Sequence, residues 1–260
     1  MGLMFFGFAG FCASIIIFAI HGFAHVSGNA VIAALLTGFV YLFANLYYYK
    51  AVQSGEVSRV IPLLYLDALI TAVLSGMYLG EIFSPLKYLG ILLVVLGAIL
   101  ISYQKGLHIK NNKAVWFCLV AALLFAVYDL LLKVSFNNGD FWTVFAYIRL
   151  ATFAGLLPMY FLKGKTIVDL AVRQTRGFFI VLSSNILGIL GVVFFGLSVA
   201  RGYVALAASL AAIQPFTVFL IVLGLSLFYP KVLKEEQGKM IFAQKLAAII
   251  LMFIGVMLIT

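Results

Sequence analysis

The chain has 260 residues, of which 65% are hydrophobic and 10% are charged, and its formal net charge is +9. Soluble domains are about one quarter charged, so this composition excludes a water-soluble fold, whose exterior would need more polar side chains. The positive charge does not indicate nucleic-acid binding, because the basic residues lie in short gaps between apolar runs and not along one face.

Nine apolar stretches follow one another along the chain, each close to the roughly 20 residues that a transmembrane helix needs. They cover residues 3–20, 31–52, 57–79, 86–104, 115–134, 141–162, 178–199, 204–229 and 241–260. Only the gap at 163–177 is long enough to hold an amphipathic surface segment. The sequence therefore predicts an all-α integral membrane protein with about nine transmembrane helices.

The placement of lysine and arginine predicts the orientation of these helices. Of the 17 basic residues, thirteen lie on the same side of the membrane as the N-terminus, and only Lys87, Lys133 and Arg201 lie on the other side. Arg149 falls inside the stretch at 141–162. The side rich in basic residues is predicted to be cytoplasmic, which puts the C-terminus outside.

The two halves of the chain show the same order of features. A shift of 147 residues aligns Gly55 with Gly202, Val57 with Val204, Leu63 with Leu210 and Asp67 with Gln214. Matching helices are five apart, so they cross the membrane in opposite directions, as in the inverted repeats of many secondary transporters. We predict a first, incomplete repeat of four helices at 1–104 and a second repeat of five helices at 114–260.

Several short motifs occur in a recognisable order along the chain. They are the QSGE and ARG turns, the LGE at Leu79 to Glu81, the glycine spacing from Gly90 to Gly97, LLFAVYDLLLK ending at Lys133, and AYIRLATFAGLLP around Arg149. With these motifs the chain resembles an EamA-type member of the drug/metabolite transporter superfamily. The resemblance implies ten helices in two inverted five-helix repeats, of which the first helix is not seen here. It also implies a location in the cell (inner or plasma) membrane and export of amino acids, metabolites or drugs. The resemblance further implies a cytoplasmic C-terminus, whereas the placement of basic residues predicts an external one.

Polar and ionisable side chains inside a bilayer are costly, so each is a candidate for a substrate or ion pathway. The candidates are Asp67, Gln214, Asp129, Lys133, Arg149, Asn45 and Asn185. Asp67 and Gln214 are aligned by the repeat, and one interpretation is that they line a shared cavity. The other is that Asp67 forms a hydrogen bond with a neighbouring helix or with Tyr65.

Each of the other candidates also has two interpretations. Asp129 and Lys133, four residues apart on one helix face, form either a neutralising pair near the surface or a pair that opens for a substrate or proton. Arg149 pairs with Asp129 or binds an anionic substrate. Asn45 and Asn185 line a cavity or join helices by hydrogen bonds.

Proline and glycine predict where helices bend or approach closely. Pro62 and Pro215 remove backbone hydrogen bonds within the stretches at 57–79 and 204–229, so we expect hinges there. Gly76 and Gly80 form a GxxxG pattern that predicts a close contact between helices.

The chain contains no Walker A motif and no cluster of metal-binding residues, so we expect neither ATP hydrolysis nor a cofactor. The predicted partners are the lipid bilayer, a small-molecule substrate and protons as a candidate coupling ion. The predicted function is that of a transporter, so we expect no enzymatic activity. Two alternatives to a transporter stay open. One is a lipid-modifying enzyme, although its acids would be clustered and those of this chain are scattered. The other is an assembly subunit that does not transport.

Overall fold

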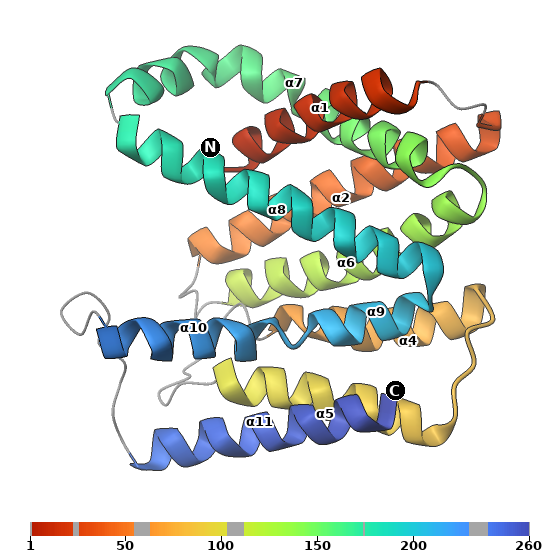
Figure 1. Ribbon diagram of the computed structural model, residues 1–260, viewed down its shortest axis with the longest axis vertical. Helices are drawn as coiled ribbons and strands as arrows, with labels where there is room; N and C mark the ends of the chain where they lie inside the picture. The colour runs from red at the N-terminus through yellow and green to blue at the C-terminus, as the bar shows by residue number, and fades with distance from the viewer. Residues whose placement is uncertain are drawn as a thin grey trace. The chain divides into compact units, whose positions relative to one another are not determined.

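A computed structural model describes residues 2–22, 26–54, 63–102, 112–173, 175–228 and 239–259. Every regular element within these residues is an α-helix (Figure 1). In chain order they are α1 (Gly2–His21), α2 (Gly28–Ser54), α4 (Leu66–Tyr78), α5 (Pro85–Ser102), α6 (Asn112–Asn137), α7 (Phe141–Arg173), α8 (Thr175–Arg201), α9 (Val204–Ala211), α10 (Gln214–Phe228) and α11 (Lys239–Ile259). Five helices of the described residues are long and apolar enough to cross a membrane. The predicted all-α membrane class is confirmed.

Most of the predicted stretches coincide with helices, and three differ. In the stretch at 57–79, the described helix α4 starts only at Leu66, after a turn at Tyr65. Helix α7 continues to Arg173, beyond the predicted end at residue 162, because a helix can extend past its apolar run into polar surroundings. The stretch at 204–229 is divided into α9 and α10, with residues 212 and 213 between them.

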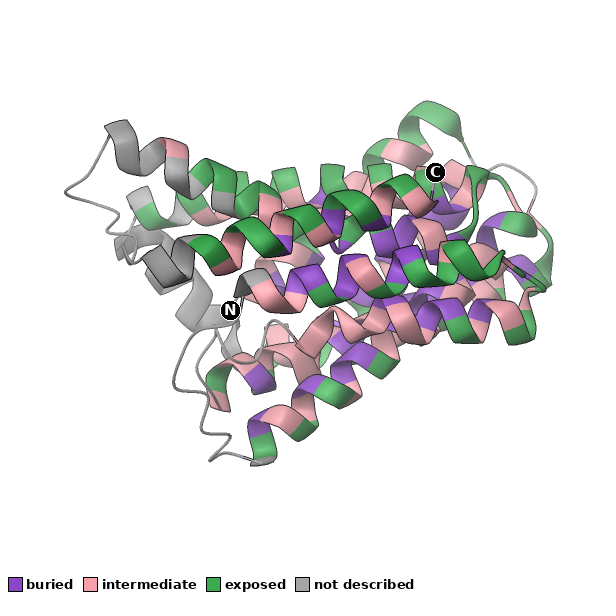
Figure 2. Ribbon diagram, turned by 90° about the horizontal axis from the view of Figure 1, so that it is seen from below, coloured by how far each residue is buried: buried purple, intermediate pink, exposed green. Residues whose placement is uncertain are grey.

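Many side chains on the exposed helix faces are apolar, as contact with lipid requires. Exposed residues follow one side of several helices, and buried residues follow the other (Figure 2). On α1, for example, Phe8 and Ile20 are 50% and 72% exposed, whereas Met4 is 1% exposed. Apolar side chains turned outward are stable in hydrocarbon, which agrees with a multi-pass membrane protein.

The chain forms two compact units, and each draws on both halves of the sequence. Unit 1 comprises residues 1–46 and 127–203, and unit 2 comprises residues 47–126 and 204–260. The units therefore do not coincide with the predicted repeats at 1–104 and 114–260. Those boundaries concern the order of the sequence, and they stay a prediction.

In unit 1, helices α1 and α2 pack against α7 through small and hydroxyl side chains. The Ser14 hydroxyl donates to the carbonyl oxygen of Ala146 over 3.1 Å, and the Thr152 hydroxyl donates to that of Gly38 over 3.2 Å. A Cβ atom on Gly38 would overlap the Ile148 carbonyl oxygen, so only glycine permits this approach. These contacts hold α7 firmly at the level of Ile148 and its neighbours.

In unit 2, helices α5 and α11 lie side by side, and their glycines set the spacing (Figure 1). A Cβ on Gly90 would lie 2.7 Å from the Gly255 carbonyl oxygen, and a Cβ on Gly255 would lie 2.7 Å from that of Gly90. Further along, a Cβ on Gly97 would lie 2.8 Å from the Ala248 carbonyl oxygen. Since the contacts run from Gly90–Gly255 to Gly97–Ala248, the two helices are antiparallel.

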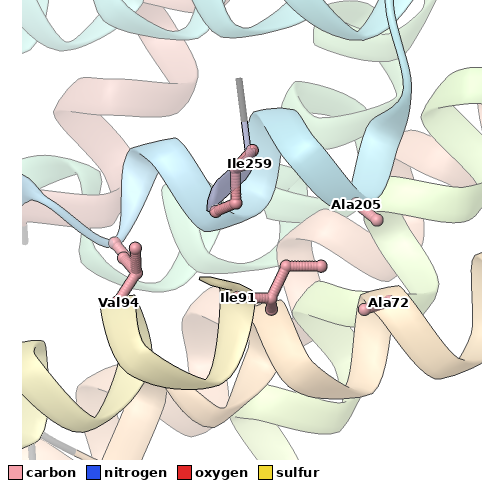
Figure 3. Packing of buried hydrophobic residues seen from close by; sticks show 6 residues of the cluster. Ala72, Ile91, Val94, Ala205 and Ile259 are labelled. Atoms are coloured by element: carbon pink, nitrogen blue, oxygen red, sulfur yellow. The ribbon is translucent and has the colours of Figure 1, made fainter. Parts of the chain in front are cut away.

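A buried apolar cluster joins these helices to α4 and α9. It contains Ala72 of α4, Ile91 and Val94 of α5, Ala205 of α9 and Ile259 of α11 (Figure 3). The small residues on α4 and α9 let these two helices pack closely, as is typical of membrane helices.

The predicted close contact at Gly76 and Gly80 is wrong. A Cβ on Gly76 would make only an ordinary contact, 3.5 Å from the Tyr88 hydroxyl oxygen, and no atom of the described residues lies within 4 Å of one on Gly80. Gly80 has φ +68° and follows Leu79, the C-cap of α4. It therefore ends the helix, because glycine adopts this left-handed conformation without steric cost.

Candidate functional site

Two interruptions of helical structure in unit 2 lie 147 residues apart. Tyr65 forms a turn before α4, and residues 212 and 213 form a turn between α9 and α10. The shift that aligns Asp67 with Gln214 sets Tyr65 opposite Ala212. Asp67 is the second residue of α4, and Gln214 is the first residue of α10. Each interruption is thus followed directly by a helix that begins with a polar side chain.

The Asp67 carboxylate lies at the positive end of α4. Its Oδ1 accepts a hydrogen bond of 2.6 Å from the backbone N–H of Ala68. A carboxylate in the first turn of a helix is stabilised by the helix dipole and by the free N–H groups there. The Gln214 side chain is exposed.

The turn between α9 and α10 keeps most of its backbone hydrogen bonds. The N–H of Ala212 donates to the carbonyl of Ala208, and the N–H of Phe216 donates to that of Ile213. Pro215 is the second residue of α10, where its missing N–H costs little. Pro215 therefore begins a helix, whereas we expected it to kink a continuous one. A hinge at this place stays a prediction. Pro62 lies outside the described residues.

Glu81 fixes the start of α9, a role that no local sequence pattern indicates. It follows α4, is 5% exposed, and accepts hydrogen bonds from the backbone N–H groups of Val204 (2.9 Å) and Ala205 (3.2 Å). It therefore caps the N-terminus of α9 from another segment of unit 2. The LGE motif, which includes this residue, indicates a family resemblance but no capping role.

In unit 1, Arg149 lies inside a cluster of aromatic rings. The side chain is 1% exposed, and its Cζ lies 4.6 Å from the ring centre of Tyr41, 5.3 Å from that of Phe145 and 6.0 Å from that of Phe6. Among the residues that the structure describes, none accepts a hydrogen bond from its Nε, Nη1 or Nη2. A cation over aromatic faces is attracted by the ring quadrupoles, which offsets part of its desolvation cost.

Asp129 lies near this cluster. Its side chain is 5% exposed, and both Asp129 and Arg149 are electrostatic neighbours of the buried Tyr128 hydroxyl. The structure thus brings two of the predicted pathway residues, Asp129 and Arg149, to the same region of unit 1. The three aromatic residues around Arg149 were not predicted, since they come partly from α1 and α2, far away in sequence.

Lys133 caps the end of α8. Its Nζ donates to the carbonyl oxygens of Val199 (2.9 Å) and Gly202 (2.7 Å). A cation at a helix C-terminus satisfies free carbonyls and complements the helix dipole. This gives Lys133 a structural task, and its predicted pairing with Asp129 stays a prediction.

Asn45 and Asn185 bond within their own helices. The Nδ2 of Asn45 donates to the Tyr41 carbonyl (2.8 Å), and that of Asn185 donates to the Val181 carbonyl (2.6 Å). A role in a pathway stays a prediction for both. No group of three or more metal-binding side chains occurs among the described residues.

Comparisons with known proteins find a family match over the first part of the chain. Residues 2–103 match the model of the EamA-like transporter family. No curated protein matches. A solved structure described as "Crystal structure of protein" is similar to this chain, with a TM-score of 0.70 and 17% sequence identity. The match covers 100% of this chain and 86% of the other chain. At that identity the likeness shows the fold alone. The resemblance read from the motifs is thus confirmed by a match over residues 2–103 to the EamA-like transporter family, part of the drug/metabolite transporter superfamily.

Proposed function

We propose that the chain is a secondary active transporter, and no enzyme, that exports a small solute across the cell membrane by alternating access. The observation that carries this proposal is the pair of interruptions at Tyr65 and at residues 212–213. Irregular backbone at membrane depth is tolerated where it is buried in protein or lines a water-filled cavity. In secondary transporters, discontinuous helices at corresponding positions of two repeats form the solute and ion site.

The inverted repeat gains support from the way that helices pair within each unit. In unit 1, α1 packs against α7, and in unit 2, α4 packs against α9 and α5 against α11. When the nine predicted apolar stretches are numbered in chain order, these pairs join the first with the sixth, the third with the eighth and the fourth with the ninth. The contacts of α5 with α11 are also reciprocal, as a two-fold relation between matching helices requires.

Asp67 is the residue that we assign to the coupling proton. It begins a half-helix in the interrupted region, and its carboxylate can gain and lose a proton without displacing a structural cation. Asp129 is the second candidate. Transport without ATP needs an ion or solute gradient, and a carboxyl group that binds a proton in one state and releases it in the other supplies that coupling.

Proteoliposomes that enclose a pH-sensitive dye test the proposal. Amino acids, carboxylates and aromatic cations are added in turn, and solute-driven pH change is measured beside solute exchange. We expect one class to move protons, and we expect Asp67→Asn to abolish the pH change while solute exchange continues. Asp140→Asn, at an exposed carboxylate, is the matched control.

Two results would count against these assignments. If no class of solute moves while the protein is folded and oriented, the transporter proposal fails, and an assembly subunit becomes the better interpretation. If Asp67→Asn and Asp129→Asn both couple like the unaltered protein, proton coupling through either carboxylate is refuted.

A further inference from the structure

Arg149 and Tyr128 are buried in unit 1 with hydrogen-bond donors that nothing in the described chain accepts. Arg149 is 1% exposed and Tyr128 is 4% exposed. Neither the three guanidinium nitrogens nor the Tyr128 hydroxyl makes a well-formed hydrogen bond with any described residue, although the guanidinium lies close to that hydroxyl. Buried polar groups are nearly always satisfied, so two such groups in one cluster require an explanation.

The cluster has a definite composition, which we call the arginine cage: Phe6, Tyr41, Tyr128, Phe145 and Arg149. The Tyr41 and Tyr128 rings lie 4.8 Å apart, so the hydroxyl and the guanidinium share one aromatic surface. Gly10 lies against the arginine stem, where a Cβ would be 3.4 Å from Cδ, and leaves room for the side chain to run inward. The cage comes from four helices, α1, α2, α6 and α7.

We propose that the arginine cage binds the carboxylate of a monoanionic solute that has a flat apolar body. A guanidinium offers paired donors that match a carboxylate, and such pairs are the strong, oriented kind. The Tyr128 hydroxyl supplies another donor, and the aromatic rings suit an apolar ring or chain. A doubly charged phosphate fits less well, because the cage holds one positive charge and Asp129 lies nearby.

The inference rests on the proposed transport function in one respect. Since Arg149 is almost fully enclosed, a solute reaches it only when the surrounding helices part, as alternating access supposes. The binding chemistry itself does not depend on transport, and it can be measured without a membrane gradient.

Thermal unfolding of the detergent-solubilised full chain tests the cage. Benzoate is the probe, benzamide is its neutral counterpart, and inorganic phosphate represents a doubly charged anion. A ligand that binds the folded state raises the unfolding midpoint. We expect benzoate alone to raise it, Arg149→Met to weaken benzoate binding at least tenfold, and Tyr128→Phe to weaken it severalfold. Arg201→Met, at an exposed arginine of α8, should bind benzoate normally.

A purely structural role for Arg149 predicts different results. If Arg149 neutralised Asp129, Arg149→Met would be strongly destabilised, and the double variant with Asp129→Asn would regain stability. We expect instead that Arg149→Met is as stable as the unaltered chain without ligand. Benzoate binding that survives both Arg149→Met and Tyr128→Phe would overturn the proposal. Tyr128→Phe keeps the ring, so it decides the matter even where Arg149→Met does not fold.

The two proposals fail in distinguishable ways. If benzoate binds through Arg149 but proteoliposomes move no solute, the cage stands and the transporter falls. If solutes move equally in Arg149→Met whether or not they carry a carboxylate, the transporter stands and the cage falls.

Discussion

Removal of the Glu81 carboxylate should loosen the start of α9. This carboxylate accepts the N–H groups of Val204 and Ala205, both in buried residues. A buried N–H left without an acceptor costs about 1–3 kcal/mol. Loss of the carboxylate also removes its own desolvation cost, so we expect Glu81→Ala to lower the free energy of unfolding by about 2–3 kcal/mol in total. Glu81→Gln keeps one acceptor oxygen and should lose roughly half of that amount.

Asp140 provides a matched control, because it also caps a helix. Its Oδ2 accepts the backbone N–H and the hydroxyl of Thr143 at the start of α7, each over 2.9 Å, but its side chain is exposed. Asparagine caps a helix about as well as aspartate, so Asp140→Asn should change stability by less than about 0.5 kcal/mol.

Unfolding in mixed detergent micelles, followed by circular dichroism, measures these differences. Hydrogen exchange gives a local readout, because a loss of about 2 kcal/mol would speed exchange at the Val204 and Ala205 amides roughly 30-fold. If Glu81→Ala unfolds like the unaltered protein and both amides stay protected, the capping role is refuted.

Three further changes have outcomes that the packing dictates. Gly90→Ala should cost about 1–3 kcal/mol in the same unfolding assay, because the new Cβ would lie 2.7 Å from the Gly255 carbonyl oxygen. Gly191→Ala, whose Cβ would meet no described atom within 4 Å, should be neutral or stabilising. Lys133→Met should raise hydrogen exchange near the C-terminus of α8, since two carbonyls there lose their donor; unchanged protection would contradict this. Thr152→Val should cost about 0.6 kcal/mol, a typical value for a hydrogen bond between membrane helices, and a cost near zero would mean that the contact with α2 contributes nothing.

The positions of the helices could be predicted because hydropathy is a local property. The stretches at 86–104 and 115–134 coincide closely with α5 and α6, for example. The interruption at residues 212–213 escaped prediction because the small apolar residues around it have the same hydropathy as a continuous helix. Only Pro215 indicated a disturbance, and it lies at the start of α10.

The contacts of the candidate site could not be predicted in the same way. Glu81 caps a helix that starts 123 residues later, and no local pattern encodes that partner. Arg149 could be recognised as a buried charge, but its aromatic neighbours Phe6 and Tyr41 lie on helices that only folding brings to it. The sequence thus indicates which side chains are costly in lipid, and the tertiary structure decides what surrounds them.

The short turn between α9 and α10 divides the apolar stretch at 204–229 into two mechanically different parts. Helix α9 is buried and tied at its first residues by Glu81, whereas α10 carries exposed apolar side chains such as Val218 and Ile221. Because the turn keeps its own hydrogen bonds, bending there breaks few of them. Helix α10 can therefore pivot while α9 stays in place, and a small rotation at the turn becomes a large displacement at the far end of α10.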